Sequence, residues 1–253
     1  MSEVKQIAYS NNAWKGFIAE KWQNEIASAD FEQWYNQQNR KTVVSYLSRD
    51  VTQIETAQGI IYVKEIRALT DAGLKGKDIF SFLKWVLRPS RAIAGWNISL
   101  KILQEGFLCA VPVLAIRKRN TWAYPTDYFV SEEINAPLLS EKLPTLPGNK
   151  QIEMAEIIAE QLCEFHLAGF VHGDCILRNI CINENNKLIY LDNDRTKKKS
   201  LKNPFVRSKR NLAQFAYNAR RNKLSEEFVD CFLEKYAEKA KWQERKKRRI
   251  IKN

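Results

Sequence analysis

The sequence predicts an α+β fold in which a small antiparallel sheet with helices precedes a mainly helical half. From residue 42, apolar and polar residues alternate in three short runs, at 42–47, 51–56 and 60–64. A period of two is typical of strands, and Gly59 marks the turn into the third run. After residue 150, apolar side chains instead recur at the three- and four-residue spacing of helices.

The same two periods predict the other elements. Helical spacing indicates helices at residues 29–37, 77–87, 90–106, 151–168 and from 226 to 240. Two further apolar segments, at 107–117 and 127–130, complete the predicted sheet. Residues 137–149 contain three Pro and one Gly, so we expect a linker along the surface there.

Composition limits the class of protein. The chain has 253 residues, 45% of them hydrophobic, which is enough for one large domain or two small ones with a packed core. Five Cys with no CxxC pair, several of them in apolar runs, predict reduced thiols in a cytoplasmic protein. Residues 1–16 lack the apolar core of a signal peptide, and no apolar run approaches the roughly 20 residues of a membrane span. Two His exclude a His-rich metal site.

The net charge of +12 is concentrated at one end of the chain. Residues 195–253 hold 20 of the 41 Lys and Arg residues but only 6 of the 29 Asp and Glu residues. They include the run Arg245-Lys246-Lys247-Arg248-Arg249. This distribution describes a surface suited to anionic partners and carries no information about the fold.

Candidate catalytic residues gather in residues 167–196. His172, Gly173 and Asp174 follow an apolar run, and Asn179 comes five residues after Asp174. Two strand-like runs follow, at 180–182 and 188–191, and the second ends on Asp192. A hairpin between these runs would bring Asp174, Asn179 and Asp192 to the same end.

These residue types suit phosphoryl transfer from a metal-bound nucleotide. One carboxylate, Asp174, would orient the attacking hydroxyl and accept its proton. An amide oxygen from Asn179 and the carboxylate of Asp192 would hold Mg²⁺ against the phosphates. A short HxDxxxxN match can also arise by chance, because Asp and Asn are common in turns.

The pattern resembles the catalytic loop of protein kinases, and its H-G-D-x-x-x-x-N and D-x-D-R forms resemble the lipopolysaccharide kinases of Gram-negative bacteria. The resemblance covers about residues 40–220. It implies a bilobal protein-kinase-like fold, with an N-lobe over residues 1–131 and a C-lobe over 132–253. It also implies an ATP-dependent phosphotransferase whose acceptor is an alcohol group, a Kdo or heptose hydroxyl of the lipopolysaccharide inner core.

The resemblance assigns nucleotide contacts in the predicted N-lobe. Lys64, at the end of the third run, would reach the phosphates of ATP, although a Lys there can also be an ordinary edge charge. Backbone groups of Glu132 and Ile134 would bind adenine, and a solvated loop is the alternative. In the helix at 90–106, many family members have an acidic residue where this chain has Gly95. Glu105, at the far end, is the only Glu there, so no partner for Lys64 is assigned.

The resemblance also implies cofactors, partners and location. ATP and Mg²⁺ are the expected cofactors, and Kdo–lipid A or another core intermediate is the expected acceptor. The basic run at 245–249 is expected to hold the protein at the anionic inner membrane, peripherally and on the cytoplasmic side. No nucleic-acid partner is expected, because the charge is terminal and no recognition motif accompanies it.

Roles for three more residues are expected, and two other functions stay open. His172 is expected to brace the loop backbone, and His166, in the last turn of a helix, to be a structural residue whose positive charge suits the helix dipole. Asp194 would assist Asp192 or contact the acceptor. The alternatives are a different kinase-like transferase, such as a small protein kinase or an antibiotic kinase, and a non-catalytic nucleotide-binding pseudokinase.

Overall fold

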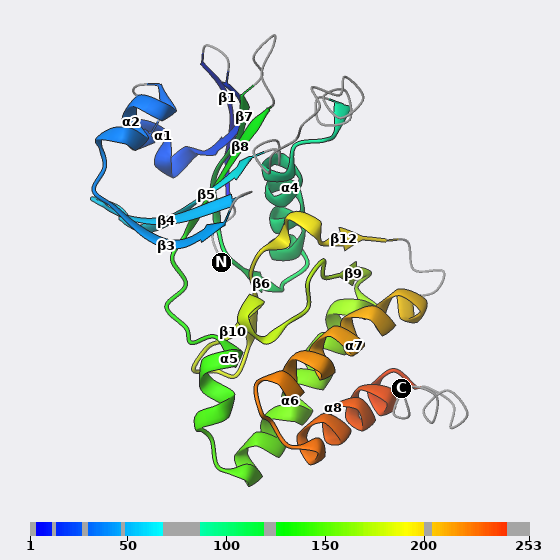
Figure 1. Cartoon of the computed structure of the whole chain (residues 1–253). Coiled ribbons are helices and arrows are strands. Elements are labelled where there is room, and N and C mark those ends of the chain that lie inside the picture. Colours follow the sequence, from blue (N-terminus) through cyan, green and yellow to red (C-terminus); the bar gives the residue numbers. More distant parts are fainter. Residues whose placement is uncertain are drawn as a thin grey trace, which may run out of the picture. The chain divides into compact units, whose positions relative to one another are not determined.

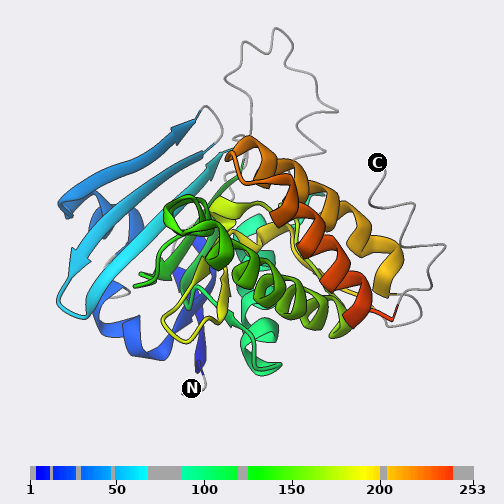
Figure 2. The same cartoon turned by 90° about the horizontal axis from the view of Figure 1, so that it is seen from below.

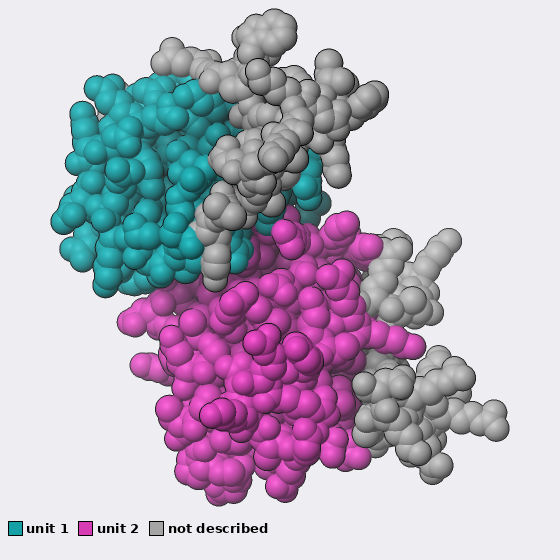
Figure 3. Space-filling view, in the orientation of Figure 1, with its two compact units in different colours: residues 1–101, 110–133 teal, residues 102–109, 134–253 magenta. Residues whose placement is uncertain are grey.

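The structure, a computed structural model, describes residues 4–11, 14–26, 30–46, 49–67, 87–118, 125–199 and 204–241 (Figure 1). The chain forms two compact units (Figure 3). The first comprises residues 1–101 and 110–133, and the second comprises residues 102–109 and 134–253. The chain therefore passes between the units three times, and the short excursion at 102–109 has no counterpart in the sequence prediction.

A seven-stranded antiparallel sheet forms the centre of the first unit. Its strands are ordered β1-β2-β7-β8-β5-β4-β3. The strands in chain order are β1 Gln6–Asn11, β2 Trp14–Ala19, β3 Arg40–Tyr46, β4 Arg49–Thr56, β5 Gly59–Arg67, β7 Pro112–Lys118 and β8 Thr126–Glu132. The three alternating runs are β3, β4 and β5, so these predicted strands are confirmed.

Helices cover both faces of this sheet (Figure 1). On one face lie the 3-10 turn η1 Glu20–Trp22 and the helices α1 Gln23–Ile26 and α2 Phe31–Gln37. On the other lies α4 Arg91–Gln104, where the Trp96 ring stacks on Phe17 of β2 at a centroid distance of 6.1 Å.

Side chains cap two helices of this unit. The Asp30 carboxylate accepts a hydrogen bond from the Glu32 N–H at 3.0 Å, at the start of α2. The Ser90 hydroxyl accepts one from the Ile93 N–H at 3.2 Å, at the start of α4. The predicted helix at 77–87 lies outside the described residues, apart from its last residue.

Two sequence expectations for this sheet were incomplete. The β1–β2 hairpin was not predicted, because residues 1–40 mix aromatic and polar residues without a clear alternation. The predicted strand at 107–117 is divided: β6 Leu108–Cys109 pairs with β11 Leu188–Tyr190 in the second unit, and β7 begins at Pro112. Proline lacks an N–H and is tolerated at the first position of a strand, which fits this break.

The second unit is mainly helical. Its helices are α5 Leu139–Lys142, α6 Gly148–Leu167, α7 Pro204–Arg221 and α8 Glu226–Lys239, with 3-10 turns η2 Leu143–Thr145, η3 Leu177–Asn179 and η4 Asn193–Arg195. Its short strands are β6, β9 Phe170–Val171, β10 Ile180–Ile182, β11 Leu188–Tyr190 and β12 Lys197–Lys198. The helices α7 and α8 lie side by side in both views (Figures 1 and 2).

Residues 137–149 do not form the surface linker that their Pro content suggested. They fold into α5, η2 and the first residues of α6, and Leu139 and Leu143 are fully buried. These leucines are four residues apart, so one face of a short helix buries both. Pro144 stands in the first turn of η2, where a missing N–H costs no hydrogen bond.

The predicted helices at 151–168 and 226–240 are present as α6 and α8, and their bounds differ from the prediction by at most three residues. The chain leaves α6 through Gly169, whose φ of +88° suits glycine after a helix C-terminus. Ser225 caps α8 by accepting a hydrogen bond from the Phe228 N–H at 3.1 Å. Among the described residues, no helix is both long and apolar enough to cross a membrane.

Candidate active site

The loop between β9 and β10 brings Asp174 and Asn179 together. The Asn179 side chain donates through Nδ2 to the Asp174 carbonyl oxygen at 2.9 Å and to its Oδ2 at 3.3 Å. The turn η3 holds this geometry, since the Asn179 N–H donates to the Ile176 carbonyl at 2.9 Å. Because Nδ2 faces Asp174, the oxygen Oδ1 is the group of Asn179 that could bind a cation.

His172 joins this loop to the end of β11. Its Nδ1 accepts the Asp174 N–H at 3.1 Å, and its Nε2 is 2.8 Å from the Leu191 carbonyl oxygen. A carbonyl only accepts, so the ring is the neutral tautomer with its proton on Nε2. Burial lowers the pKa of His172, against the opposing effects of the Leu191 hydrogen bond and the nearby carboxylates. The expectation that His172 braces the loop is confirmed.

Asp192 belongs to the same group of side chains. The Leu191 N–H donates to the Asn179 carbonyl at 2.9 Å, so the residue before Asp192 is tied to the loop twice. Both Asp174 and Asp192 act electrostatically on the His172 ring. These contacts place the chain at Asp192 beside the loop that carries Asp174 and Asn179, within the second unit.

The backbone of Asp192 is left-handed, with φ of +52° and ψ of +50°. This conformation is uncommon outside glycine, and Asp tolerates it better than most residues. The next residue supports the turn: the Asn193 side chain is buried and donates to the Tyr190 carbonyl at 3.0 Å. Strained backbone of this kind is frequent at functional sites.

Gly173 has a steric reason to be glycine. A Cβ at this position would lie 2.7 Å from the Arg195 carbonyl carbon and 2.9 Å from its Cα. These are backbone atoms, which cannot rotate away. The glycine of the His-Gly-Asp sequence thus allows the turn after Asp192 to pack directly against the loop.

Asn211, on α7, fixes the backbone of His172 from the other side. Its Oδ1 accepts the His172 N–H at 2.9 Å and its Nδ2 donates to the His172 carbonyl at 2.7 Å. Asn211 is completely buried. The sequence did not predict this contact, because nothing local marks a partner 39 residues upstream.

His166 extends this buried network but is not a cation. Its Nε2 is 3.0 Å from Asn211 Oδ1 and its Nδ1 is 2.7 Å from the Tyr236 hydroxyl. Desolvation by burial lowers the pKa of His166 to about 4, so the ring is neutral near pH 7. The expected structural role is correct. The expected favourable charge at the helix end is wrong, because complete burial outweighs the helix dipole.

Lys64 and Glu132 lie on neighbouring strands of the first unit. Lys64 pairs with Phe129 of β8, and Glu132 pairs with Ile61 of β5. Directly paired residues share a face and the face alternates along a strand, so these two side chains point to opposite faces. The Glu132 carboxylate accepts hydrogen bonds from Trp22 Nε1 at 3.0 Å and from Lys21 Nζ at 3.1 Å.

Only backbone groups of Glu132 and Ile134 suit the nucleotide contact expected of them. The Glu132 N–H already donates to the Val111 carbonyl at 2.9 Å, which leaves its carbonyl oxygen. Ile134 is the first residue after the last passage of the chain into the second unit.

The helix α4 contains no Asp or Glu. It packs on the sheet face that includes Phe17. Directly paired residues share a face of the sheet, and the pairs run from Phe17 to Ala115, from Ala115 to Phe129 and from Phe129 to Lys64. Lys64 therefore projects from the face that α4 covers. Glu105, just beyond the helix, forms an ion pair with Lys198 inside the second unit.

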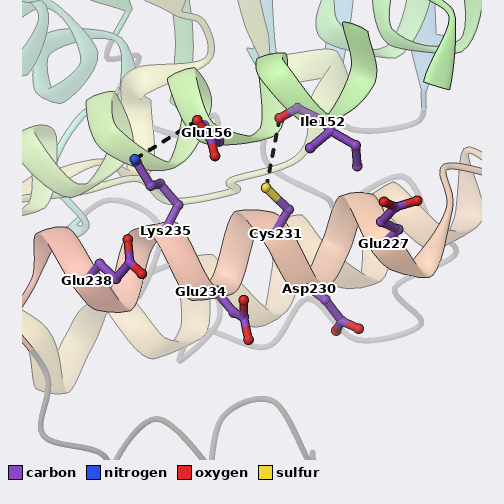
Figure 4. A pocket seen from close by; sticks show the side chains of 8 residues that line it. All are labelled: Ile152, Glu156, Glu227, Asp230, Cys231, Glu234, Lys235 and Glu238. Atoms are coloured by element: carbon purple, nitrogen blue, oxygen red, sulfur yellow. Dashed lines mark hydrogen bonds and ion pairs between the residues drawn. The ribbon is translucent and has the colours of Figure 1, made fainter. Parts of the chain in front are cut away.

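A separate groove of about 470 Å³ lies between α6 and α8 (Figure 4). None of the predicted site residues lines it. Five of its lining side chains are acidic: Glu156, Glu227, Asp230, Glu234 and Glu238. Within the described part of the chain, no group of three or more His, Cys, Asp or Glu side chains is arranged to hold a metal ion.

The antiparallel sheet with its helix, the helical second unit and the His-Gly-Asp loop define a kinase-like protein. A solved structure described as WaaP in complex with acyl carrier protein has a similar fold, with a TM-score of 0.61 and 17% sequence identity over 92% of this chain and 98% of that chain. Residues 81–252 match the family model of the lipopolysaccharide kinase (Kdo/WaaP) family, and this chain belongs to that family. No curated protein sequence matches significantly.

Proposed function

We propose that this protein is an ATP-dependent kinase that phosphorylates a hydroxyl of Kdo or heptose in the lipopolysaccharide inner core. Membership in a lipopolysaccharide kinase family makes it a phosphotransferase of lipopolysaccharide biosynthesis. The observation that carries the finer proposal is the group formed by Asp174, Asn179 and Asp192, which His172 ties together through Asp174 and Leu191.

Asp174 is the proposed general base. Its Oδ2 is held by Asn179 at 3.3 Å, and its backbone N–H is held by His172 at 3.1 Å. A carboxylate fixed in this way can accept a proton from the acceptor hydroxyl and orient that hydroxyl for in-line attack. Such positioned base catalysis contributes about 10²–10⁴ in rate.

Asn179 and Asp192 fit a Mg²⁺ ion. They offer an amide oxygen and a carboxylate, the hard oxygen ligands that Mg²⁺ prefers, and Mg²⁺ commonly takes only one or two carboxylates together with substrate phosphates and water. When bound, the ion would neutralise charge that develops on the phosphates. The left-handed turn at Asp192 and the buried Asn193 side chain fix the position from which this carboxylate extends.

Lys64, Glu132 and Ile134 are the proposed nucleotide contacts. The ammonium group of Lys64 would bind the phosphates of ATP, as the corresponding Lys does in kinases. Adenine would be recognised by the backbone carbonyl of Glu132 and the backbone N–H of Ile134. The engagement of the Glu132 carboxylate by Lys21 and Trp22 supports a backbone role for this residue.

The proposed acceptor is lipid-linked, so the protein would work at a membrane surface. Each Lys or Arg near an anionic leaflet gains about 1 kcal/mol, so the five basic residues at 245–249 provide at most about 5 kcal/mol. This would suffice for reversible binding at the cytoplasmic face of the inner membrane. Removing residues 244–253 should weaken sedimentation with anionic vesicles at low salt, and unchanged sedimentation would contradict this role of the tail.

The test is ATP-dependent labelling of lipid A–core intermediates, followed by mass spectrometry of the product. Kdo–lipid A, a core intermediate that carries heptose, a soluble protein and an aminoglycoside should be offered side by side. Labelling of the lipid acceptor alone, with added mass of one phosphate on Kdo or heptose, is the expected result. Labelling of only the protein or the aminoglycoside would replace the proposal with a different kinase-like transferase.

A non-catalytic nucleotide-binding protein is the second candidate. The observation that favours it is the sequence of α4, which contains no Asp or Glu. ATP binding at ordinary affinity, with no transfer to any of these acceptors in the presence of Mg²⁺, would support this candidate over the first.

A further inference from the structure

The outer face of α7 carries two pairs of cationic residues, one toward each end of the described helix, with an exposed aromatic ring between them. The exposed residues among the described side chains of this helix are Lys209, Arg210, Ala213, Tyr217, Arg220 and Arg221. At 3.6 residues per turn, they occupy about a third of the helix circumference. Four of the six are cationic, and the helix contains no Asp or Glu. We refer to Lys209, Arg210, Tyr217, Arg220 and Arg221 as the α7 stripe.

Packing fixes the direction in which the stripe points. Leu212, Phe215, Ala216 and Ala219 are buried on the opposite side of α7. The Phe215 ring stacks on Phe232 of α8, with ring centroids 4.4 Å apart. Because the helix cannot rotate without exposing these residues, the stripe stays on the surface of the second unit.

Most of the positive charge of the stripe is uncompensated. Arg220 forms a two-pronged ion pair with Glu226, at 2.9 and 2.8 Å. Within the residues that the structure describes, no carboxylate lies in ion-pair range of Lys209, Arg210 or Arg221. Acidic side chains of this unit gather instead in the groove between α6 and α8 (Figure 4).

An aromatic side chain stands in the middle of the stripe. Tyr217 is 63% exposed, which is unusual for a large ring, and the Arg221 guanidinium lies over it at 5.9 Å from the centroid. Tyrosine combines an apolar ring with a polar hydroxyl, and it is enriched at the interface between lipid and water. Cationic residues attract anionic headgroups, and an exposed tyrosine ring can enter the interface between lipid and water, so this face suits an anionic bilayer.

We propose that the α7 stripe is a contact surface for an anionic lipid bilayer, separate from the basic residues beyond 241. The choice of a bilayer as the partner rests on the proposed function, because a lipid-linked acceptor requires the protein at a membrane. The stripe binds lipid headgroups through Lys209, Arg210 and Arg221, while the ring of Tyr217 enters the interface. It therefore presents the folded second unit to the membrane in one orientation.

The expected size of the effect follows from the charge. Each Lys or Arg near an anionic surface strengthens binding about fivefold at low salt. Three such residues together contribute about 100-fold. This is large enough to separate the stripe from the tail when each is removed in turn.

The experiment is sedimentation with vesicles, without nucleotide or acceptor, so the result does not depend on any transferase activity. One set of vesicles is pure phosphatidylcholine, and the other is an equal mixture of phosphatidylcholine and phosphatidylglycerol. The full chain and a chain lacking residues 242–253 are each tested with the reversal Lys209→Glu, Arg210→Glu and Arg221→Glu. The matched control reverses three exposed lysines on other elements, Lys101→Glu, Lys150→Glu and Lys187→Glu, for the same change in net charge.

The stripe reversal should weaken binding to the anionic vesicles by at least about 100-fold in both chains, and the control reversal should weaken it less than tenfold. Equal losses in the two triple variants would overturn the proposal. Unchanged vesicle binding of the truncated chain after stripe reversal would also overturn the proposal. The same holds if the stripe reversal weakens binding to duplex DNA but does not weaken binding to vesicles. If the reversed protein unfolds by circular dichroism, the neutral variant Lys209→Gln, Arg210→Gln and Arg221→Gln replaces it, with an expected loss of at least tenfold.

Discussion

Asn211 holds both backbone groups of His172, accepting the N–H at 2.9 Å and donating to the carbonyl at 2.7 Å. One buried side chain on α7 thus sets the position of the residue from which the loop toward Asp174 begins. His172 in turn binds the Asp174 N–H and the Leu191 carbonyl. The proposed site is therefore supported from behind by a helix that contributes none of the proposed catalytic or metal-binding residues.

Replacing Asn211 by Ala should damage both stability and activity. The change leaves two buried backbone groups without partners, at about 1–3 kcal/mol each, so we expect a loss of about 3 kcal/mol in the free energy of unfolding. Gln214→Ala is the control, since Gln214 bonds Asn211 only at 3.3 Å and is half-buried. Urea denaturation measures the difference. A loss below about 1 kcal/mol would show that the two hydrogen bonds do not support the loop.

Gly173→Ala should be poorly tolerated. Its new Cβ would press against the backbone of Arg195, and overpacking of this kind costs about 1–3 kcal/mol. Gly148→Ala is the matched control, because a Cβ there meets no atom within 4 Å. The thermal unfolding temperature and the rate of phosphoryl transfer should both fall for Gly173→Ala, and neither should fall for Gly148→Ala. Identical behaviour of the two variants would mean that Arg195 can move away without cost.

The buried His166 predicts a specific loss of stability in acid. Its pKa is about 4 in the folded protein and 6.5 ordinarily, so between these pH values the unfolded chain binds more protons and the free energy of unfolding falls as the pH falls. The full effect is about 3 kcal/mol below pH 4. Comparison with His166→Gln isolates it, because other titrating groups are common to both proteins.

Urea denaturation at pH 7 and pH 4.5 provides the measurement for His166. The wild-type advantage over His166→Gln should shrink by about 2 kcal/mol on acidification. Parallel pH profiles for the two proteins would indicate that His166 titrates normally and is not isolated from water.

Asp192→Asn should weaken Mg²⁺ binding more than it lowers the free energy of unfolding. Asn tolerates the left-handed backbone at this position but removes the negative charge. We expect the free Mg²⁺ concentration for half-maximal rate, at saturating ATP, to rise at least about tenfold, the loss typical of altered metal-site groups. Asp230→Asn, an exposed change on α8, should leave it unchanged. A normal Mg²⁺ dependence would remove Asp192 from the metal site.

The parts of the fold that the sequence predicted are those with local signals. Strands β10 and β11 follow two apolar runs separated by turn-forming residues at 183–187, and the hairpin determines where Asp192 lies. Gly169 marks the end of α6 through its positive φ, which is a local signal that the sequence shows.

The parts that the sequence missed depend on distant contacts. Asn211 is one of many Asn residues until α7 packs it against His172. The pKa of His166 is set by burial between three helices, which outweighs its position in a helix end. Leu139 and Leu143 turn a Pro-rich segment into a short helix because the second unit offers them a core.

The most direct test of the central claim is the single-turnover rate of phosphoryl transfer by Asp174→Asn to the lipid A–core acceptor that the wild-type protein labels. With Asp174 as the general base, the rate should fall by about 10²–10⁴, while ATP affinity and the free energy of unfolding stay close to the wild-type values. A rate within a few fold of wild type would contradict the assignment of Asp174 and, with it, the proposed mechanism.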